Sequence, residues 1–228
     1  MAAQKIQKIA VAGAGLMGHG IAQEFAAAGY QVKMYDLSDD ALHQAQQRIE
    51  SNLLLLQEAE LVTAAQSQKA LENLSASTKL DEVVGDADLV VEAIAEKLEV
   101  KQEIFRRFDE WCPQHTILAS NTSTFMPSKL AQVTGRADKV LVTHYFNPPF
   151  LMPLVEIVRS PATSETTIKT VYDLLEGLGK SPVVVQKEVP GFIGNRIQAA
   201  ALREALALVE EGVATPQEVD TVIKTSIG

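Results

Sequence analysis

An imidazole and a carboxylate twelve residues apart are the side chains of this sequence best suited to moving a proton. His144 stands at the end of one apolar run, and Glu156 stands inside the next. Imidazole titrates near neutral pH, which suits a general base, and a buried carboxylate is costly unless it has a partner. Taken alone, His144 would more often be a structural histidine. The two together predict a base and the carboxylate that orients it.

Two further polar side chains stand where ligands bind in open α/β sheets, at strand ends and helix starts. Ser123 closes the stretch Ser120-Asn-Thr-Ser, and Asn195 follows Pro190-Gly near the start of a helical pattern. Such groups stabilise charge that develops on a substrate oxygen. Each also has a plain structural interpretation, because Ser123 and Asn195 could instead cap the helices that follow them.

A glycine-rich turn, Gly13-Ala-Gly15-Leu-Met-Gly18, follows the first strand pattern and opens a helix. Gly13 permits the tight turn, Gly15 leaves room for a pyrophosphate, and Gly18 allows close packing of the helix, whose free N–H groups face the anion. Asp36 ends the next strand, where a carboxylate accepts hydrogen bonds from ribose hydroxyls and repels a 2′-phosphate. A domain that binds another ligand, or none, is the alternative. The pattern predicts an NAD site made of Gly13, Gly15, Leu16, Met17, Gly18 and Asp36.

Short runs rich in Val and Ile alternate along the chain with longer stretches of helical period. This alternation predicts parallel strands joined by right-handed crossovers, and hence a doubly wound α/β sheet. The leucines at 53–56 are expected to form the buried stripe of their helix. The predicted strands are residues 8–12, 31–35, 89–93, 116–119, 140–143, 154–158 and 182–186, and the predicted helices are residues 16–28, 40–60, 100–111 and 164–178.

The end of the sheet departs from this parallel order. The connection that contains Asn147-Pro-Pro is too short for a crossover helix, so an antiparallel return is predicted, which would let His144 meet Glu156. After residue 186 the pattern is purely helical, with one helix over 192–213 and another opened by Thr215-Pro. We therefore expect a Rossmann-type domain over residues 1–187 and the start of an all-helical domain over residues 188–228.

Composition narrows the classes of function. The 228 residues are 46% apolar and 21% charged, as in ordinary globular proteins, and the net charge of −9 argues against a nucleic-acid partner. A single cysteine, Cys112, excludes an internal disulfide, and no metal site is predicted. The N-terminus lacks a secretory pattern, and no apolar run approaches the ~18 residues that cross a bilayer. We expect a soluble, cytoplasmic protein without membrane contact.

Together these motifs resemble the L-3-hydroxyacyl-CoA dehydrogenase family, including 3-hydroxybutyryl-CoA dehydrogenases, over nearly the whole chain. The resemblance implies a Rossmann-type domain and a helical dimerisation domain, of which this chain would hold only the first part, and a homodimer at full length. It implies that His144 is the catalytic base, that Glu156 is its partner, and that Ser123 and Asn195 hold the reacting oxygen. It also implies that the nicotinamide-ribose end of NAD is lined by Glu96, Lys101 and Asn147, and that Ser123 belongs to the cofactor site as well.

Two departures leave the substrate open. Typical acyl-CoA members carry lysines in the helix after the second strand, where they meet the CoA phosphates, whereas residues 48–60 hold Arg48 and no lysine. Many members also have a basic residue before Leu-Val-Glu, where this chain has Met152-Pro153. The leading interpretation is an NAD-dependent L-3-hydroxyacyl-CoA dehydrogenase. A dehydrogenase of a free 3-hydroxy acid such as L-gulonate or L-carnitine, and a non-catalytic dinucleotide-binding protein, are the alternatives.

Overall fold

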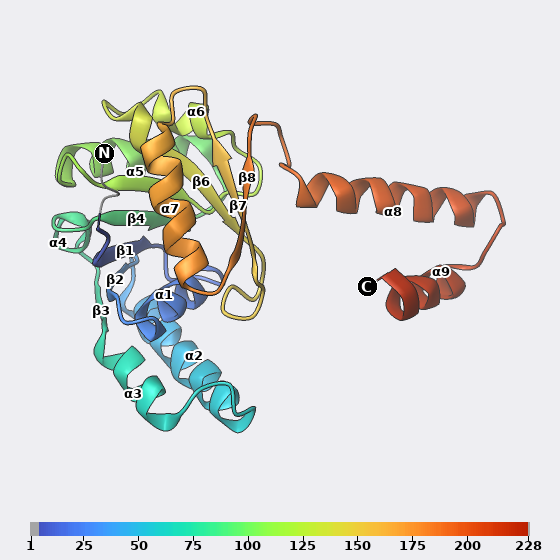
Figure 1. Cartoon of the computed structure of the whole chain (residues 1–228), viewed down its shortest axis with the longest axis horizontal. Coiled ribbons are helices and arrows are strands. Elements are labelled where there is room, and N and C mark those ends of the chain that lie inside the picture. The colour runs from blue at the N-terminus through green and yellow to red at the C-terminus, as the bar shows by residue number, and fades with distance from the viewer. Residues whose placement is uncertain (1–4, 228) are drawn as a thin grey trace. The chain divides into compact units, whose positions relative to one another are not determined.

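The computed structural model describes residues 5–227, which divide into two compact units with the boundary between Pro190 and Gly191. The first unit contains a β-sheet covered by helices, and the second contains helices only (Figure 1). No helix in the described part of the chain is long and apolar enough to span a membrane.

One eight-stranded sheet forms the centre of the first unit, in the order β3-β2-β1-β4-β5-β6-β7-β8. The first six strands run parallel, β7 is antiparallel to β6, and β8 is parallel to β7. Ligands of such sheets bind where the strand order reverses, which is between β1 and β4 here. The strands are β1 (Lys8–Ala12), β2 (Gln31–Tyr35), β3 (Leu74–Ser77), β4 (Leu89–Glu92), β5 (Ile117–Ser120), β6 (Val140–Tyr145), β7 (Leu154–Arg159) and β8 (Ser181–Val185).

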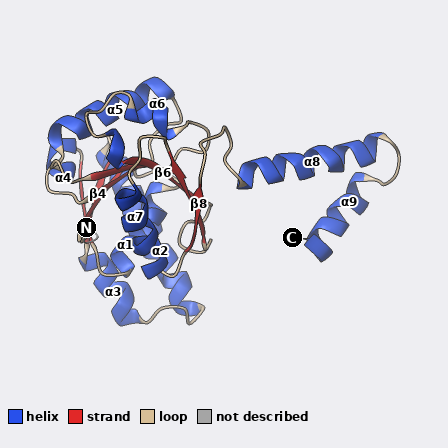
Figure 2. Cartoon of the chain, turned by 45° about the horizontal axis from the view of Figure 1, so that its top comes forward, coloured by secondary structure: helices blue, strands red, loops and turns tan. Residues whose placement is uncertain are grey.

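Helices cover both faces of this sheet (Figure 2). Side chains alternate between the two faces along a strand, so Ile9 and Val11 of β1 belong to one core and Ala10 and Ala12 to the other. The first core also contains residues of α1, α2 and α7, and the second core contains residues of α4, α5 and α6. The helices of this unit are α1 (Gly18–Ala27), α2 (Asp39–Glu58), α3 (Ala64–Glu72), α4 (Leu80–Val84), α5 (Leu98–Trp111), α6 (Pro127–Ala131) and α7 (Glu165–Gly177).

The starts of three helices are explained by capping side chains. Ser38 accepts a hydrogen bond from the N–H of Ala41 at the start of α2, and Ser164 accepts one from the N–H of Thr167 at the start of α7. Thr63 forms a reciprocal capping box with Gln66 at α3. These side chains satisfy N–H groups that have no partner within the first turn of a helix.

The predicted sheet is confirmed, including the antiparallel return from β6 to β7. All seven predicted strands are present with ends shifted by at most two residues. The edge strand β3 was not predicted, because its sequence Leu-Ser-Ala-Ser is short, small and partly exposed. The prediction for the leucine run was wrong: Leu53 is buried, whereas Leu54 and Leu55 are 59% and 62% exposed. Consecutive helical residues are rotated by about 100°, so four in a row cannot share one face.

The second unit consists of α8 (Gly194–Glu210), α9 (Pro216–Val222) and a π-helical turn, η2 (Ile223–Ile227). Neither α8 nor α9 contains a buried residue. The predicted cap is confirmed, since Thr215 and Glu218 form a capping box and Pro216 takes the first helical position of α9.

Candidate active site

The three glycines of the turn between β1 and α1 differ in the space that a side chain would find at each position. Gly13 has a φ of +103°, and a Cβ there would lie 2.4 Å from the carbonyl oxygen of Ala93. A Cβ at Gly18 would lie 1.7 Å from the carbonyl oxygen of Gly13, so the start of α1 and the turn meet without room for a side chain. At Gly15 a Cβ would meet no atom within 4 Å. The turn is therefore tight on its protein side and open at Gly15.

The start of α1 offers donors to an anion. Among residues 5–227, no hydrogen-bond acceptor faces the N–H groups of Leu16 and Met17. The ring of His19 is buried and its Nδ1 lies 2.7 Å from the carbonyl oxygen of Gly15, which braces the turn. Burial lowers the pKa of His19 below its usual value. Open space at Gly15 beside unpaired N–H groups at a helix start fits a pyrophosphate.

Asp36 follows β2 and is held at the mouth of the turn. Its Oδ2 accepts a hydrogen bond from the N–H of Ala14 at 2.8 Å, and its Oδ1 accepts one from the N–H of Leu37 at 2.8 Å. Each carboxylate oxygen has a second lone pair for another donor. The backbone thus fixes the orientation in which Asp36 can receive ribose hydroxyls.

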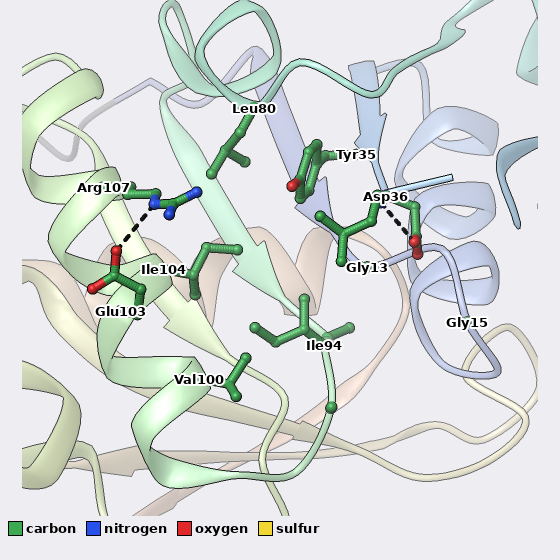
Figure 3. A pocket seen from close by; sticks show the side chains of 13 residues that line it. Gly13, Gly15, Tyr35, Asp36, Leu80, Ile94, Val100, Glu103, Ile104 and Arg107 are labelled. Atoms are coloured by element: carbon green, nitrogen blue, oxygen red, sulfur yellow. Dashed lines mark hydrogen bonds and ion pairs between the residues drawn. The ribbon is translucent and has the colours of Figure 1, made fainter. Parts of the chain in front are cut away.

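A cavity of about 450 Å³ lies between the glycine turn, the end of β2 and α5 (Figure 3). This volume lies within the range of small-molecule sites. One wall is apolar and comes from Leu80, Ile94, Val100 and Ile104, and Arg107 stands at the rim with its Nε 3.2 Å from Glu103. Of the predicted cofactor residues, the lining of the cavity contains Gly13, Gly15 and Asp36.

His144 and Glu156, the predicted base and its carboxylate partner, lie side by side on neighbouring strands. The register of β6 and β7 places His144 directly opposite Glu156, and the imidazole Nδ1 lies 2.8 Å from the Oε2 of Glu156. Both side chains are buried, and the His144 ring also packs against Phe146 with ring centroids 4.7 Å apart. A carboxylate bonded to one ring nitrogen selects the tautomer of the other.

Lys101 and Glu96 belong to a buried ionic network. The Lys101 ammonium on α5 lies 2.6 Å from Glu92 and 3.1 Å from Glu96, and its side chain is only 1% exposed. Ser120 donates a hydrogen bond to Glu92 at 2.5 Å. Burial raises the pKa of the Glu92 carboxyl above its usual value, against the opposing charge of Lys101. Lys101 thus ties α5 to the end of β4, while the side chain of Glu96 remains 40% exposed.

Glu96 also fixes the loop that carries Ser123. Its Oε1 accepts hydrogen bonds from the hydroxyls of Thr122 and Thr124 and from the N–H of Ser123 at 3.2 Å. Burial alone would raise the pKa of Glu96, but these hydroxyls and the ammonium of Lys101 hold it below its usual value. Glu96 is therefore a charged anchor for the turn after β5.

The parallel strands bring these groups to one edge of the sheet. Glu92 of β4 pairs with Ser120 of β5, and Ser120 pairs with Val142 of β6, two residues before His144. Next to His144, the N–H of Tyr145 donates to the side chain of Asn121 at 3.0 Å. The loop after β5, which contains Ser123, is thereby tied to the strand that carries His144.

The remaining predicted residues lie in two places. Asn147 is an exposed residue of the loop between β6 and β7, and Asn195 lies in the first turn of α8 in the second unit. The capping alternatives for Ser123 and Asn195 do not hold, because α6 and α8 begin after Met126 and Ile193 without a side-chain cap.

Sequence reasoning missed several residues of the site. The apolar wall of the cavity and Arg107 lie on segments whose sequence pattern predicts only a helix or no regular element. Glu92 carried a detectable signal, since it is a carboxylate at the end of the apolar run Leu-Val-Val-Glu. Within the described residues, no group of three or more His, Cys, Asp or Glu side chains could hold a metal ion.

Comparison with known proteins places the chain in a family. Family profiles match both units: 3-hydroxyacyl-CoA dehydrogenase, NAD binding domain, over residues 8–189, and 3-hydroxyacyl-CoA dehydrogenase, C-terminal domain, over residues 191–228. The chain is 41% identical to mitochondrial hydroxyacyl-coenzyme A dehydrogenase of Sus scrofa, over 98% of this chain and 72% of that protein.

Two bacterial proteins extend this similarity. The chain is 42% identical to a probable 3-hydroxybutyryl-CoA dehydrogenase of Bacillus subtilis, over 96% of this chain and 76% of that protein. The crystal structure of (S)-3-hydroxybutyryl-CoA dehydrogenase from Ralstonia eutropha superposes with a TM-score of 0.92 at 39% identity, covering 97% of this chain and 77% of that chain. With its glycine turn, its buried His–Glu pair and these relatives, the chain belongs to the 3-hydroxyacyl-CoA dehydrogenase family.

Proposed function

We propose that this protein is an NAD-dependent dehydrogenase that interconverts an L-3-hydroxyacyl-CoA and the corresponding 3-oxoacyl-CoA. The observation that carries the proposal is the buried hydrogen bond between His144 and Glu156, on strands of the same sheet whose first turn fits a dinucleotide. Family membership and the names of the relatives support the same reaction and the acyl-CoA class of substrate.

The cofactor is held, in this proposal, by residues of the first unit alone. The pyrophosphate would lie at Gly15 against the N–H groups of Leu16 and Met17, and Asp36 would bind the adenosine ribose. The apolar wall around Ile94 and Val100 would cover the adenine. Glu96 would line the nicotinamide-ribose end with Asn147, and Lys101 would hold Glu96 in place. Bound NAD supplies the hydride acceptor of the reaction.

The protein's own residues handle the proton. His144 takes the proton of the substrate hydroxyl during oxidation and returns it to the keto oxygen during reduction. Glu156 keeps the imidazole in the required tautomer and stabilises the imidazolium that forms. Ser123 and Asn195 donate hydrogen bonds to the substrate oxygen and stabilise the charge that develops on it.

A substrate panel tests this assignment. The protein is assayed with NADH and acetoacetyl-CoA, with dehydrocarnitine and with 3-dehydrogulonate, and His144→Ala serves as the matched inactive control. The proposal expects the highest kcat/KM with acetoacetyl-CoA. Higher kcat/KM with either free acid would move the substrate to the 3-hydroxy acid class, and turnover unaffected by His144→Ala would exclude the proposed base.

A further inference from the structure

The residue before β8, Lys180, has a buried ammonium group that the proposed chemistry does not use. Its side chain is 5% exposed. The ammonium donates to the carbonyl oxygens of Pro149 at 2.6 Å and Met152 at 2.9 Å, and it lies 2.5 Å from the Oε1 of Glu24 on α1. A lysine ammonium has three N–H donors and no acceptor. All three donors of Lys180 therefore have a fixed partner.

Two of these three partners belong to the loop of residues 146–153, which joins β6 to β7. The loop begins two residues after His144, contains Asn147, and leads into β7 with Glu156. Its end is also tied to the sheet, because the N–H of Ser181 donates to the carbonyl oxygen of Pro153 at 2.8 Å. A displacement of this loop would move Asn147 and the ends of both strands that carry the proton-transfer pair.

The third partner connects the loop to α1, the helix that the glycine turn opens. Gly20 and Glu24 are four residues apart and share one face of α1. At Gly20 the loop packs so closely that a Cβ would lie 3.1 Å from the Cδ of Pro149. The loop thus lies directly on α1 at Gly20, and Lys180 bonds it there through Glu24.

The buried pair of Lys180 and Glu24 lies among polar groups whose burial is energetically unfavourable. The Oε2 of Glu24 and the hydroxyl of Tyr145 are buried without a hydrogen-bond partner among the described residues. Burial raises the pKa of Glu24 to about 7, although the ammonium of Lys180 opposes the shift. Buried ion pairs often stabilise a fold no better than apolar residues of similar size, so the presence of this pair is weak evidence for a stabilising role.

We propose that Lys180 is a positioning residue of the dehydrogenase: its ammonium holds the loop of residues 146–153 on α1 and thereby keeps Asn147 and the His144–Glu156 pair in line with the cofactor turn. This inference rests on the proposed function for its effect on turnover, but the loop contact itself can be tested without turnover. The two backbone carbonyls are the essential partners, and Glu24 supplies the third acceptor.

Three variants separate positioning from stability. Lys180→Met removes the donors and leaves Glu24 buried and alone. The double variant Glu24→Leu/Lys180→Met removes the buried charge as well, so it restores thermal stability, but it leaves the loop carbonyls without donors. Glu24→Gln is the matched control, because Lys180 keeps both carbonyls and an amide oxygen in place of the carboxylate.

The experiment measures melting temperature, hydrogen–deuterium exchange of residues 146–153, and kcat with acetoacetyl-CoA and NADH for each variant. We expect faster exchange in the loop and a fall in kcat of about 10²-fold in both Lys180→Met variants, since a displacement near 1 Å costs this much. The double variant should regain the wild-type melting temperature without regaining kcat. Glu24→Gln should match the wild type in loop exchange and kcat.

The inference is overturned if the double variant shows wild-type loop exchange and wild-type kcat, or if kcat recovers together with the melting temperature. If the wild type turns over none of the three substrates of the panel, the proposed function fails instead. Loop exchange then decides the inference alone: protection lost in the double variant and kept in Glu24→Gln supports it, and unchanged protection in all variants rejects it.

Discussion

At the scale of single residues, the key side chains of the candidate active site are held in one orientation by hydrogen bonds to neighbouring groups. Glu156 orients the ring of His144, the backbone orients the carboxylate of Asp36, and Glu96 holds the backbone of Ser123. Because these supports are specific hydrogen bonds, single substitutions should separate proton transfer from cofactor binding.

His144→Ala should lower kcat by roughly 10²–10⁴, the usual contribution of a positioned acid–base group. The dissociation constant for NADH should stay unchanged, because His144 is absent from the lining of the cavity at the glycine turn. Steady-state turnover and a fluorescence titration of NADH measure the two effects. Loss of NADH binding with normal turnover of bound substrate would contradict the assignment of His144 as the base.

Asp36→Ala should act on the cofactor and leave the proton step intact. Loss of a charge-assisted hydrogen bond costs about 1.5–3 kcal/mol, or roughly ten- to a hundredfold in binding. The Michaelis constant for NAD should rise by this factor, the preference for NAD over NADP should weaken, and kcat at saturating NAD should change little. Equal use of NAD and NADP by the unaltered protein is the result that this prediction excludes.

At the scale of secondary-structure elements, α1 joins the two ends of the site. Its first residues close the glycine turn, and its third and seventh residues, Gly20 and Glu24, contact the loop between β6 and β7 through Pro149 and Lys180. The position of this helix therefore sets both the cofactor turn and the loop. The burial of Glu24 on α1 also makes the stability of the fold depend on pH.

The free energy of unfolding should decrease as the pH rises from about 4.5 to about 7, because of the carboxyl group of Glu24. Its pKa is 4.5 when unperturbed and about 7 in the folded protein, so in this range the folded state binds the proton and the unfolded state has released it. The free energy of unfolding then decreases as pH rises, by roughly 3 kcal/mol across the window. Glu24→Gln should remove this component, which urea unfolding at pH 5 and pH 7.5 would reveal. Equal pH slopes for both proteins would argue against it.

At the scale of the whole molecule, the residues proposed for cofactor binding and for catalysis are distributed differently between the two units. Every residue that lines the cavity at the glycine turn lies in the first unit, as do His144 and Glu156. Asn195 and the exposed apolar residues of α8 lie in the second. Cofactor binding should therefore need only the first unit, and turnover should need both.

A chain of residues 1–190 should fold and bind NADH with the affinity of the 228-residue chain, because its two cores are complete within that range. Its turnover should be lower by about 10²-fold, since the proposed donor Asn195 is absent. Asn195→Ala in the 228-residue chain is the control and should show a comparable loss. Isothermal titration with NADH measures the affinity, and failure of the shorter chain to bind NADH would refute the division.

We expect the 228-residue chain to associate weakly through the exposed apolar side chains of α8. Ile197, Leu202 and Leu206 are 64%, 62% and 56% exposed on this helix, and exposed apolar surface of this kind favours self-association. Sedimentation velocity should show a concentration-dependent rise in mass that Leu202→Glu reduces, while Arg203→Gln, a neighbouring exposed change, should not. A monomer at every concentration would contradict the prediction.

Seven of the eight strands, and the chemistry that depends on local order, could be predicted from the sequence. The glycine spacing with Asp36 predicted the turn, because backbone conformation and close approach restrict those positions to glycine. The short Asn147-Pro-Pro connection predicted the antiparallel return that places His144 opposite Glu156, and the register of β6 and β7 confirms it. Patterns of this kind are visible in sequence because they act over a few residues or over a fixed period.

The packing of the helices on the sheet sets which distant charges meet. Lys101 bonds Glu92 and Glu96 within a buried network, and Lys180 meets Glu24 more than 150 residues earlier in the chain. In the sequence, Lys101 is marked only by the family resemblance, and Lys180 is marked by no motif. The burial and the partners of each lysine depend on how the helices pack on the sheet, which residue type does not reveal. The energetic cost of a buried charge makes each such contact specific once packing has formed. For this reason the contact of Lys180 with the loop of residues 146–153 could be found only in the folded structure, and no sequence motif predicts it.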